Sequence, residues 1–140
     1  MSDARRDDRY ERGLDAYASQ FGIPREDVPG WFAERHGERF GEEAINAAGG
    51  AWPDDCLSLR DRSLAVVAAL MAQGGVEERL RGHVRWAVEH GVTPEQLDAL
   101  VALLAVYVGF PKASVANEAV RDELARMAGE ADGAAPGGSG

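Results

Sequence analysis

The chain has 140 residues, enough to bury a hydrophobic core without disulfides or metal ions, and we expect one domain. Hydrophobic residues make up 45% of it and charged residues 28%, the balance of an ordinary soluble globular protein. The formal net charge is −9, and arginines such as Arg81 and Arg85 are interleaved with glutamates, so we find no basic patch for a nucleic acid.

Cysteine and histidine usage excludes several kinds of site. Cys56 is the only cysteine, which rules out an internal disulfide, a CxxC redox pair and a cysteine-based zinc site. The three histidines show no HxxxH or HExxH spacing, so we expect no metal. The longest apolar run, residues 64–72, is too short to cross a bilayer, and the N-terminus has no signal-like segment. We therefore predict a cytoplasmic protein with no membrane contact.

Apolar residues recur at helical spacing along nearly the whole chain, and no stretch shows the two-residue alternation of a strand. The pattern predicts a first helix over residues 10–21 and a short helical segment over residues 29–32. A further helix over residues 40–48 is expected to end at the pair Gly49 and Gly50. Residues 52–55 are interpreted as a loop, because the residue before a proline avoids the helical region.

The central helix is expected to start after Ser58, a good N-cap with Asp61 in the capping-box position. It continues to about Gln73 and is apolar on nearly every face, so other helices or subunits should surround it.

Three more helices complete the pattern. Glycines bracket one in Gly75–Gly91, and the next begins at a capping box formed by Thr93 and Gln96 and breaks at Gly109 and Pro111. A last helix is expected over residues 112–127.

The sequence thus predicts an all-α, single-domain bundle of about six helices over residues 1–128. Residues 129–140, GEADGAAPGGSG, cannot bury enough apolar surface to order themselves, so we predict a disordered C-terminal tail.

His83 is the candidate functional residue. It lies at the edge of an apolar stripe, with Arg79 four residues before it and Trp86 three residues after it, so the three project from neighbouring turns. On spacing alone, a structural histidine is the commoner outcome. His36 and His90 are interpreted as surface residues, and Cys56 as incidental.

Four short segments stand in order along residues 9 to 113. They are RYERGL at 9–14, WPDDCLSLRDRSL at 52–64, GHVR with EHGVT within 82–93, and YVGFP at 107–111 followed by Ala113. Together they resemble the carboxymuconolactone decarboxylase family, which also includes alkylhydroperoxidase D-like proteins.

The resemblance implies an all-helical fold that assembles as trimers or hexamers, with active sites near subunit contacts and His83 as a functional residue. In hydroperoxidase-type members a CxxC pair would fall at Val76 and Arg79, so this chain lacks their thiol chemistry. Decarboxylase-type members often have an acidic residue where Arg79 stands.

Decarboxylation of this type uses no cofactor, and its chemistry sets the residues it needs. An imidazole such as His83 suits delivery of a proton to carbon at neutral pH. Arg79 could bind a carboxylate or oxyanion, since the guanidinium fork matches both. Arg60 and Arg62, at the start of the central helix, are further candidates for substrate binding. Salt bridges to acidic side chains or to another chain are an equal alternative for them.

Aromatic residues could line a pocket for this substrate, although aromatics at helical spacing are more often core residues. The candidates are Trp52, Trp86 and Tyr107.

Three hypotheses follow. The first is a cofactor-independent lyase that acts on a small anionic lactone or related carboxylic acid, with His83 as proton donor and Arg79 beside it. The second is another reaction on the same scaffold, such as isomerisation or dehydration. The third is a non-enzymatic oligomeric binding protein. Peroxide reduction is a poor fit without the CxxC pair.

Overall fold

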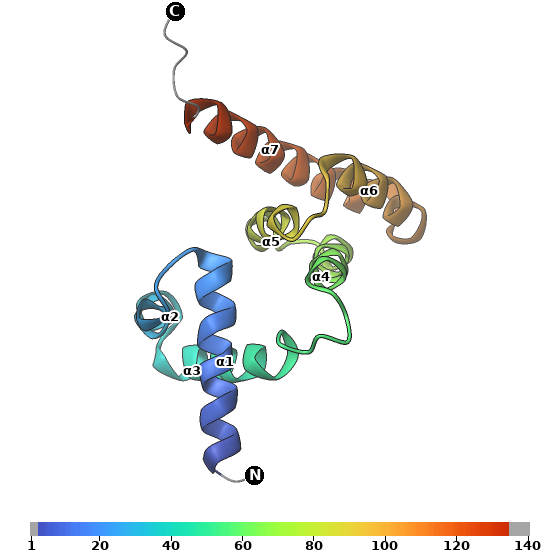
Figure 1. Ribbon diagram of the computed structural model, residues 1–140. Coiled ribbons are helices and arrows are strands. Elements are labelled where there is room, and N and C mark those ends of the chain that lie inside the picture. Colours follow the sequence, from blue (N-terminus) through green and yellow to red (C-terminus); the bar gives the residue numbers. More distant parts are fainter. Residues whose placement is uncertain (1–2, 135–140) are drawn as a thin grey trace, which may run out of the picture. The chain divides into compact units, whose positions relative to one another are not determined.

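The computed structural model describes residues 3–134, which form seven α-helices, one 3-10 helix and no strand (Figure 1). The prediction of an all-α fold is confirmed, with one α-helix more than the six expected. In order they are α1 (Asp3–Phe21), η1 (Arg25–Asp27), α2 (Val28–His36), α3 (Glu38–Ala51), α4 (Leu59–Gln73), α5 (Glu77–Glu89), α6 (Pro94–Val108) and α7 (Phe110–Ala134).

The helices belong to two compact units, which we describe separately. The first, Met1–Leu57, holds α1 to α3, and the second, Ser58–Gly140, holds α4 to α7.

In the first unit, α1 crosses α3 at close range and α2 packs on α3 (Figure 1). Glycines permit the crossing. A Cβ atom on Gly49 would lie 1.7 Å from the carbonyl oxygen of Arg9, and one on Gly13 would lie 1.8 Å from that of Ile45. The prediction that Gly49 and Gly50 end this helix is therefore wrong, because both lie within α3. Gly49 serves the backbone contact with Arg9, and Gly50 lies against the guanidinium of the Arg9 side chain.

Aromatic rings fill the rest of this unit. Phe21 stacks on Trp31 with ring centroids 4.1 Å apart, and Tyr17 meets Phe32 edge-on at 4.8 Å. Such pairs add about 0.5–1.5 kcal/mol beyond the area they bury. They surround the buried residues Leu14, Val28, Phe32 and Ile45.

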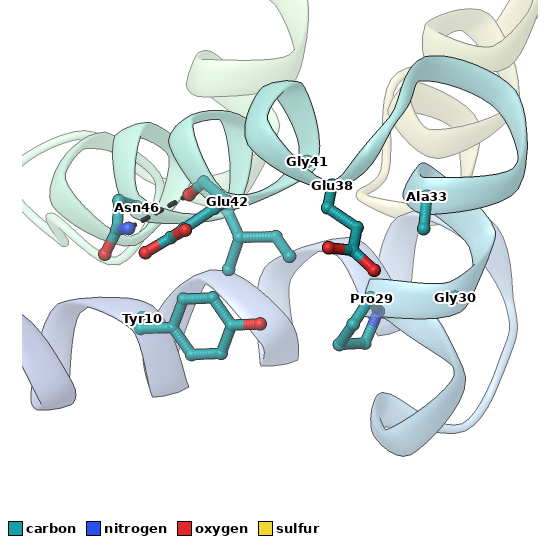
Figure 2. Close-up of a pocket in the computed structure, with 9 residues that line it drawn as sticks. Tyr10, Pro29, Gly30, Ala33, Glu38, Gly41, Glu42 and Asn46 are labelled. Carbon is teal, nitrogen blue, oxygen red and sulfur yellow. Dashed lines mark hydrogen bonds between the residues drawn. The ribbon is translucent and has the colours of Figure 1, made fainter.

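A cavity of about 550 Å³ opens among α1, α2 and α3 (Figure 2). Its walls come from Tyr10 of α1, Pro29 of α2, and Glu38, Glu42 and Asn46 of α3. Its acidic rim does not suit the anionic substrate expected from the sequence.

In the second unit, α5 packs on α4 and α7, and α6 packs on α7 and α4. The core is aliphatic and made of small side chains. Its buried members are Val67, Met71, Leu80, Val84, Ala87, Val92, Leu97, Val101, Ala116, Ala119 and Val120.

The helix α4 buries a single stripe, Ser63, Val67 and Met71, whereas Ala65 and Ala69 are exposed. Within one chain, the other helices thus cover one stripe of α4, and cover of its remaining faces by other subunits stays a prediction.

The predicted caps are confirmed. Ser58 Oγ accepts a hydrogen bond from the backbone N–H of Asp61 at 3.0 Å, and Thr93 and Gln96 form both bonds of a capping box. Removing a cap of this kind costs about 1 kcal/mol. The backbone φ of Gly109 is +92°, which turns the chain from α6 into α7.

The last helix differs from the prediction at both ends, since α7 starts at Phe110 with Pro111 in its first turn and runs to Ala134. It continues past Gly129, where the sequence predicts a tail. That prediction rests on composition, which does not show the ion pair between Glu130 and Arg85. The remainder of that predicted tail, residues 135–140, lies outside the described residues. Within the described part, no helix combines the length and apolarity needed to cross a membrane.

Candidate functional site

His83 lies on α5, which packs on α4 and α7 in the second unit. Glu77 and Glu78 in its first turn favour the helix start electrostatically, and Leu80 and Val84 bury its apolar stripe against the core. His83 borders this stripe and is partly buried. Burial lowers the pKa of its imidazole below the ordinary 6.5, so the ring is neutral at pH 7 in the free protein.

Two further rings follow His83, that of Trp86 on α5 and that of His90, the residue that caps the C-terminus of α5. The Trp86 ring centroid lies 6.0 Å from that of His83 and 4.9 Å from that of His90. Trp86 is only 3% exposed, whereas the two imidazoles are partly buried. The spacing of residues 83, 86 and 90 is i, i+3, i+7, which places all three on adjacent turns.

His90, predicted as a surface residue, is only partly exposed, and its ring is hydrogen-bonded. The seven-residue interval from His83 is the sequence signal that could have placed it near these rings. His36, interpreted in the same way, is exposed as expected.

Ser63 of α4 was not among the predicted site residues, and it contacts the ring of His90. Its Oγ lies 2.7 Å from His90 Nδ1, and the serine is only 1% exposed. Burial lowers the pKa of His90; the charge of Glu89 opposes this shift and that of Arg62 adds to it.

The predicted arginine ligands lie on two helices. The side chain of Arg79 is exposed on α5, one turn before His83. At the start of α4, Arg60 pairs with Asp61 at 3.5 Å, and Arg62 Nε donates to the carbonyl oxygen of Ser58 at 3.4 Å. All three are at least partly exposed to solvent and remain predicted substrate ligands.

The other two arginines of α5 have a structural partner in α7. Arg81 Nη1 donates to Asp122 Oδ2 at 2.6 Å, and Arg85 donates to the buried carboxylate of Glu123 and to Glu130. These hydrogen bonds raise the pKa of Arg85, and that of Glu130 is lowered by the same contact. A buried carboxylate needs such partners, so both arginines hold α7 on α5.

The predicted aromatic residues are distributed over both units. Trp86 lies beside His83, as described. Tyr107 is 80% exposed near the end of α6, and Trp52, partly buried, caps the C-terminus of α3 in the first unit. The pocket-lining roles of Tyr107 and Trp52 stay predictions.

Cys56 is exposed in the segment between α3 and α4. Among residues 3–134, no group of three or more histidine, cysteine or carboxylate side chains is placed to hold a metal ion.

Comparison with known proteins assigns the family. The model of the carboxymuconolactone decarboxylase family matches residues 40–122, more than half of the chain. The chain belongs to the carboxymuconolactone decarboxylase family. A similar protein is the 4-carboxymuconolactone decarboxylase of Acinetobacter baylyi (strain ATCC 33305 / BD413 / ADP1), 36% identical over 70 residues. That alignment covers 50% of this chain and 52% of the relative, so it spans about half the length of each protein. The matched residues 40–122 include His83, Trp86, His90 and Ser63.

Proposed function

We propose that this protein is a cofactor-independent lyase that removes carbon dioxide from a small anionic lactone or a related carboxylic acid. The observation that carries the proposal is the partly buried His83 on α5, within the segment that matches the family and beside Trp86. The relative named as a 4-carboxymuconolactone decarboxylase supports 4-carboxymuconolactone as the first substrate to test.

His83 supplies the proton. When the carboxylate leaves as carbon dioxide, its bonding electrons delocalise onto the lactone carbonyl, and the product forms once a proton reaches carbon. The imidazole of His83 is neutral in the free protein because burial lowers its pKa. A bound anion raises that pKa again, since an opposite charge within a few ångströms favours the imidazolium. Substrate binding thus produces the acid that the reaction consumes.

Arginines bind the substrate's carboxylates. Arg79 stands one helical turn from His83 on α5, and its exposed guanidinium is free to close on a ligand. Arg60 and Arg62 provide positive charge at the start of α4. The indole of Trp86 provides an apolar wall, against which loss of the carboxylate charge is favoured over its solvation.

Replacement of His83 tests this function. In His83→Gln we expect the rate of decarboxylation of 4-carboxymuconolactone to fall about 10²–10⁴-fold, the usual contribution of a positioned general acid. The measurement is loss of the substrate's ultraviolet absorbance together with release of carbon dioxide. His36→Gln, which changes an exposed histidine of the first unit, is the matched control and should keep full activity. An inert wild-type protein, or an unchanged rate in His83→Gln, contradicts the proposal.

A second reaction on the same scaffold is favoured by one observation. Arg79 places a positive charge where decarboxylase-type members of the family often have an acidic residue, and this charge suits an isomerase or dehydratase that stabilises an enolate without losing carbon dioxide. Proton exchange measured by NMR on a panel of keto acids and lactones distinguishes the two reactions.

We also propose that the protein is a homo-oligomer, a trimer or a hexamer. Leu103, Val106 and Tyr107 on α6 and Phe110 at the start of α7 are 57–80% exposed. Large apolar side chains gathered in this way mark association surfaces. Light scattering should give three or six times the chain mass of 15.0 kDa, and Val106→Glu should reduce it to a single chain. A wild-type protein that is monomeric at micromolar concentration contradicts this proposal.

A further inference from the structure

The hydrogen bond between Ser63 and His90 is a polar contact where α4 meets the C-terminal end of α5. Around it, α4 and α5 meet through Val67, Met71 and Leu80. A buried hydroxyl that holds a partly buried imidazole contributes little net stability, because both groups lose their bonds to water. Apolar side chains would join the two helices at least as well, so the polar pair is not needed for packing.

The contact fixes the ring of His90. Nδ1 is 2.7 Å from Ser63 Oγ, and one face of the imidazole is packed near the Trp86 indole, with ring centroids 4.9 Å apart. The nitrogen that Ser63 does not engage is Nε2. In a neutral imidazole one ring nitrogen is a donor and the other an acceptor, and the Ser63 hydroxyl can pair with either kind. When the hydroxyl donates to Nδ1, the ring hydrogen lies on Nε2.

His83 lies on α5 and His90 is the residue that caps its C-terminus, so the two imidazoles lie on either side of Trp86 along the chain. The reaction proposed above needs two different groups: an acid for carbon and a donor for the oxygen on which negative charge develops. A neutral imidazole N–H is suited to the second task, because it donates without having to lose its proton. Burial and the nearby charge of Arg62 both keep His90 neutral at pH 7, against the opposing charge of Glu89.

We propose that His90 is a further catalytic residue of this site, whose Nε2–H donates a hydrogen bond to the developing oxyanion of the substrate, and that Ser63 is a positioning residue that holds the required tautomer. The proposal rests on the proposed function and adds a residue to it, with His83 as the acid and His90 as the oxyanion donor.

Two replacements of His90 test this role through activity. His90→Leu keeps the approximate volume and removes the donor, and kcat for 4-carboxymuconolactone should fall about 10²–10³-fold, the usual cost of losing one oxyanion donor. KM should change less than threefold, because the bond forms in the transition state. His90→Gln keeps an N–H donor and should retain at least about ten times the kcat of the leucine variant. A residue with only a structural role would show no such rescue at equal melting temperature.

The tautomer is tested independently of activity. The ¹⁵N NMR shifts of the His90 ring in the full-length wild-type protein at pH 7.5 should show the hydrogen on Nε2. Ser63→Ala should shift the ring toward the other tautomer and lower kcat by roughly tenfold or less, in proportion to the wrong tautomer. A wild-type ring with its hydrogen on Nδ1 overturns the proposal.

Failure of this proposal differs from failure of the proposed function. If His83→Gln abolishes decarboxylation while His90→Leu keeps kcat within threefold of the wild type, the role of His90 is overturned and the lyase stands. If the wild-type protein does not decarboxylate 4-carboxymuconolactone, the proposed function fails, and the role of His90 fails with it.

Discussion

The molecule has two groupings of histidine and aromatic rings, and they differ in burial. In the first unit, the His36 ring centroid lies 5.0 Å from that of Phe40 and 6.1 Å from that of Trp31, yet His36 is exposed. In the second unit, His83 and His90 lie at similar distances from Trp86 but are partly buried.

Aromatic neighbours alone therefore do not create a chemical site. Burial lowers the pKa of both His83 and His90, and a buried hydroxyl orients one of them. The first unit uses its rings for packing, whereas the second uses small aliphatic residues for packing and leaves its rings along α5 and at its C-terminal cap. We therefore expect changes in the first unit to affect stability and changes on α5 to affect chemistry.

The largest effect on stability should come from the close crossing in the first unit. In Gly49→Ala the new methyl group would meet the backbone carbonyl of Arg9. Backbone atoms within a helix cannot move aside as the end of a flexible side chain can. We expect the free energy of unfolding to fall by about 3 kcal/mol or more, at the upper end of overpacking effects. Urea denaturation followed by circular dichroism measures it, and hydrogen exchange should show the lost protection in α1 and α3.

Gly30→Ala is the matched control in the same unit. Gly30 lies in α2, and no atom stands within 4 Å of an added Cβ. Alanine there should raise stability by about 0.5–1 kcal/mol, since glycine is the poorer helix former. Equal stability of the Gly49 and Gly30 variants would show that α1 and α3 do not approach as described.

A smaller effect should appear in the pH dependence of stability. The folded-state pKa values of His83 and His90 lie below the unfolded value of 6.5, so the unfolded chain binds more protons between these limits. Stability should level off above about pH 6.5 and fall as the pH drops below it, with most of the change coming from His83, the more deeply buried of the two imidazoles.

Thermal unfolding between pH 7.5 and 5 checks this, and His83→Gln is expected to flatten the dependence. This pH range lies above the titration of Glu130, whose pKa is lowered from 4.5 by Arg85. A wild-type melting temperature that stays the same between pH 7.5 and 5, or a His83→Gln variant with the wild-type dependence, would contradict the effect of burial on His83.

Local signals in the sequence predicted most of the helices. The caps at Ser58 and Thr93 and the end of α4 at Gln73 follow from a few adjacent residues, and the structure confirms them. The errors concern contacts between distant residues. Gly49 looks like a helix end until its contact with Arg9 is known.

In the candidate site, too, local spacing predicted some residues, and contacts between distant residues were missed. His83 and Trp86 could be proposed from their spacing on one helix, and the family resemblance placed His83 among functional residues. Ser63 could not be found, since it is 27 residues from His90 and nothing in either segment shows that their side chains meet. The length of α7 was missed for the same reason, because Arg85 and Glu130 are 45 residues apart.

The most direct test of the central claim is the pH profile of kcat/KM for decarboxylation of 4-carboxymuconolactone by the wild-type protein and by His83→Gln. Because kcat/KM reports the free enzyme, the wild-type value should fall as the pH rises through a pKa below 6.5, where the His83 imidazolium loses its proton. The residual activity of His83→Gln should lack this transition. A wild-type profile that is flat across this range, or one that His83→Gln reproduces, would contradict the assignment of His83 as the proton donor.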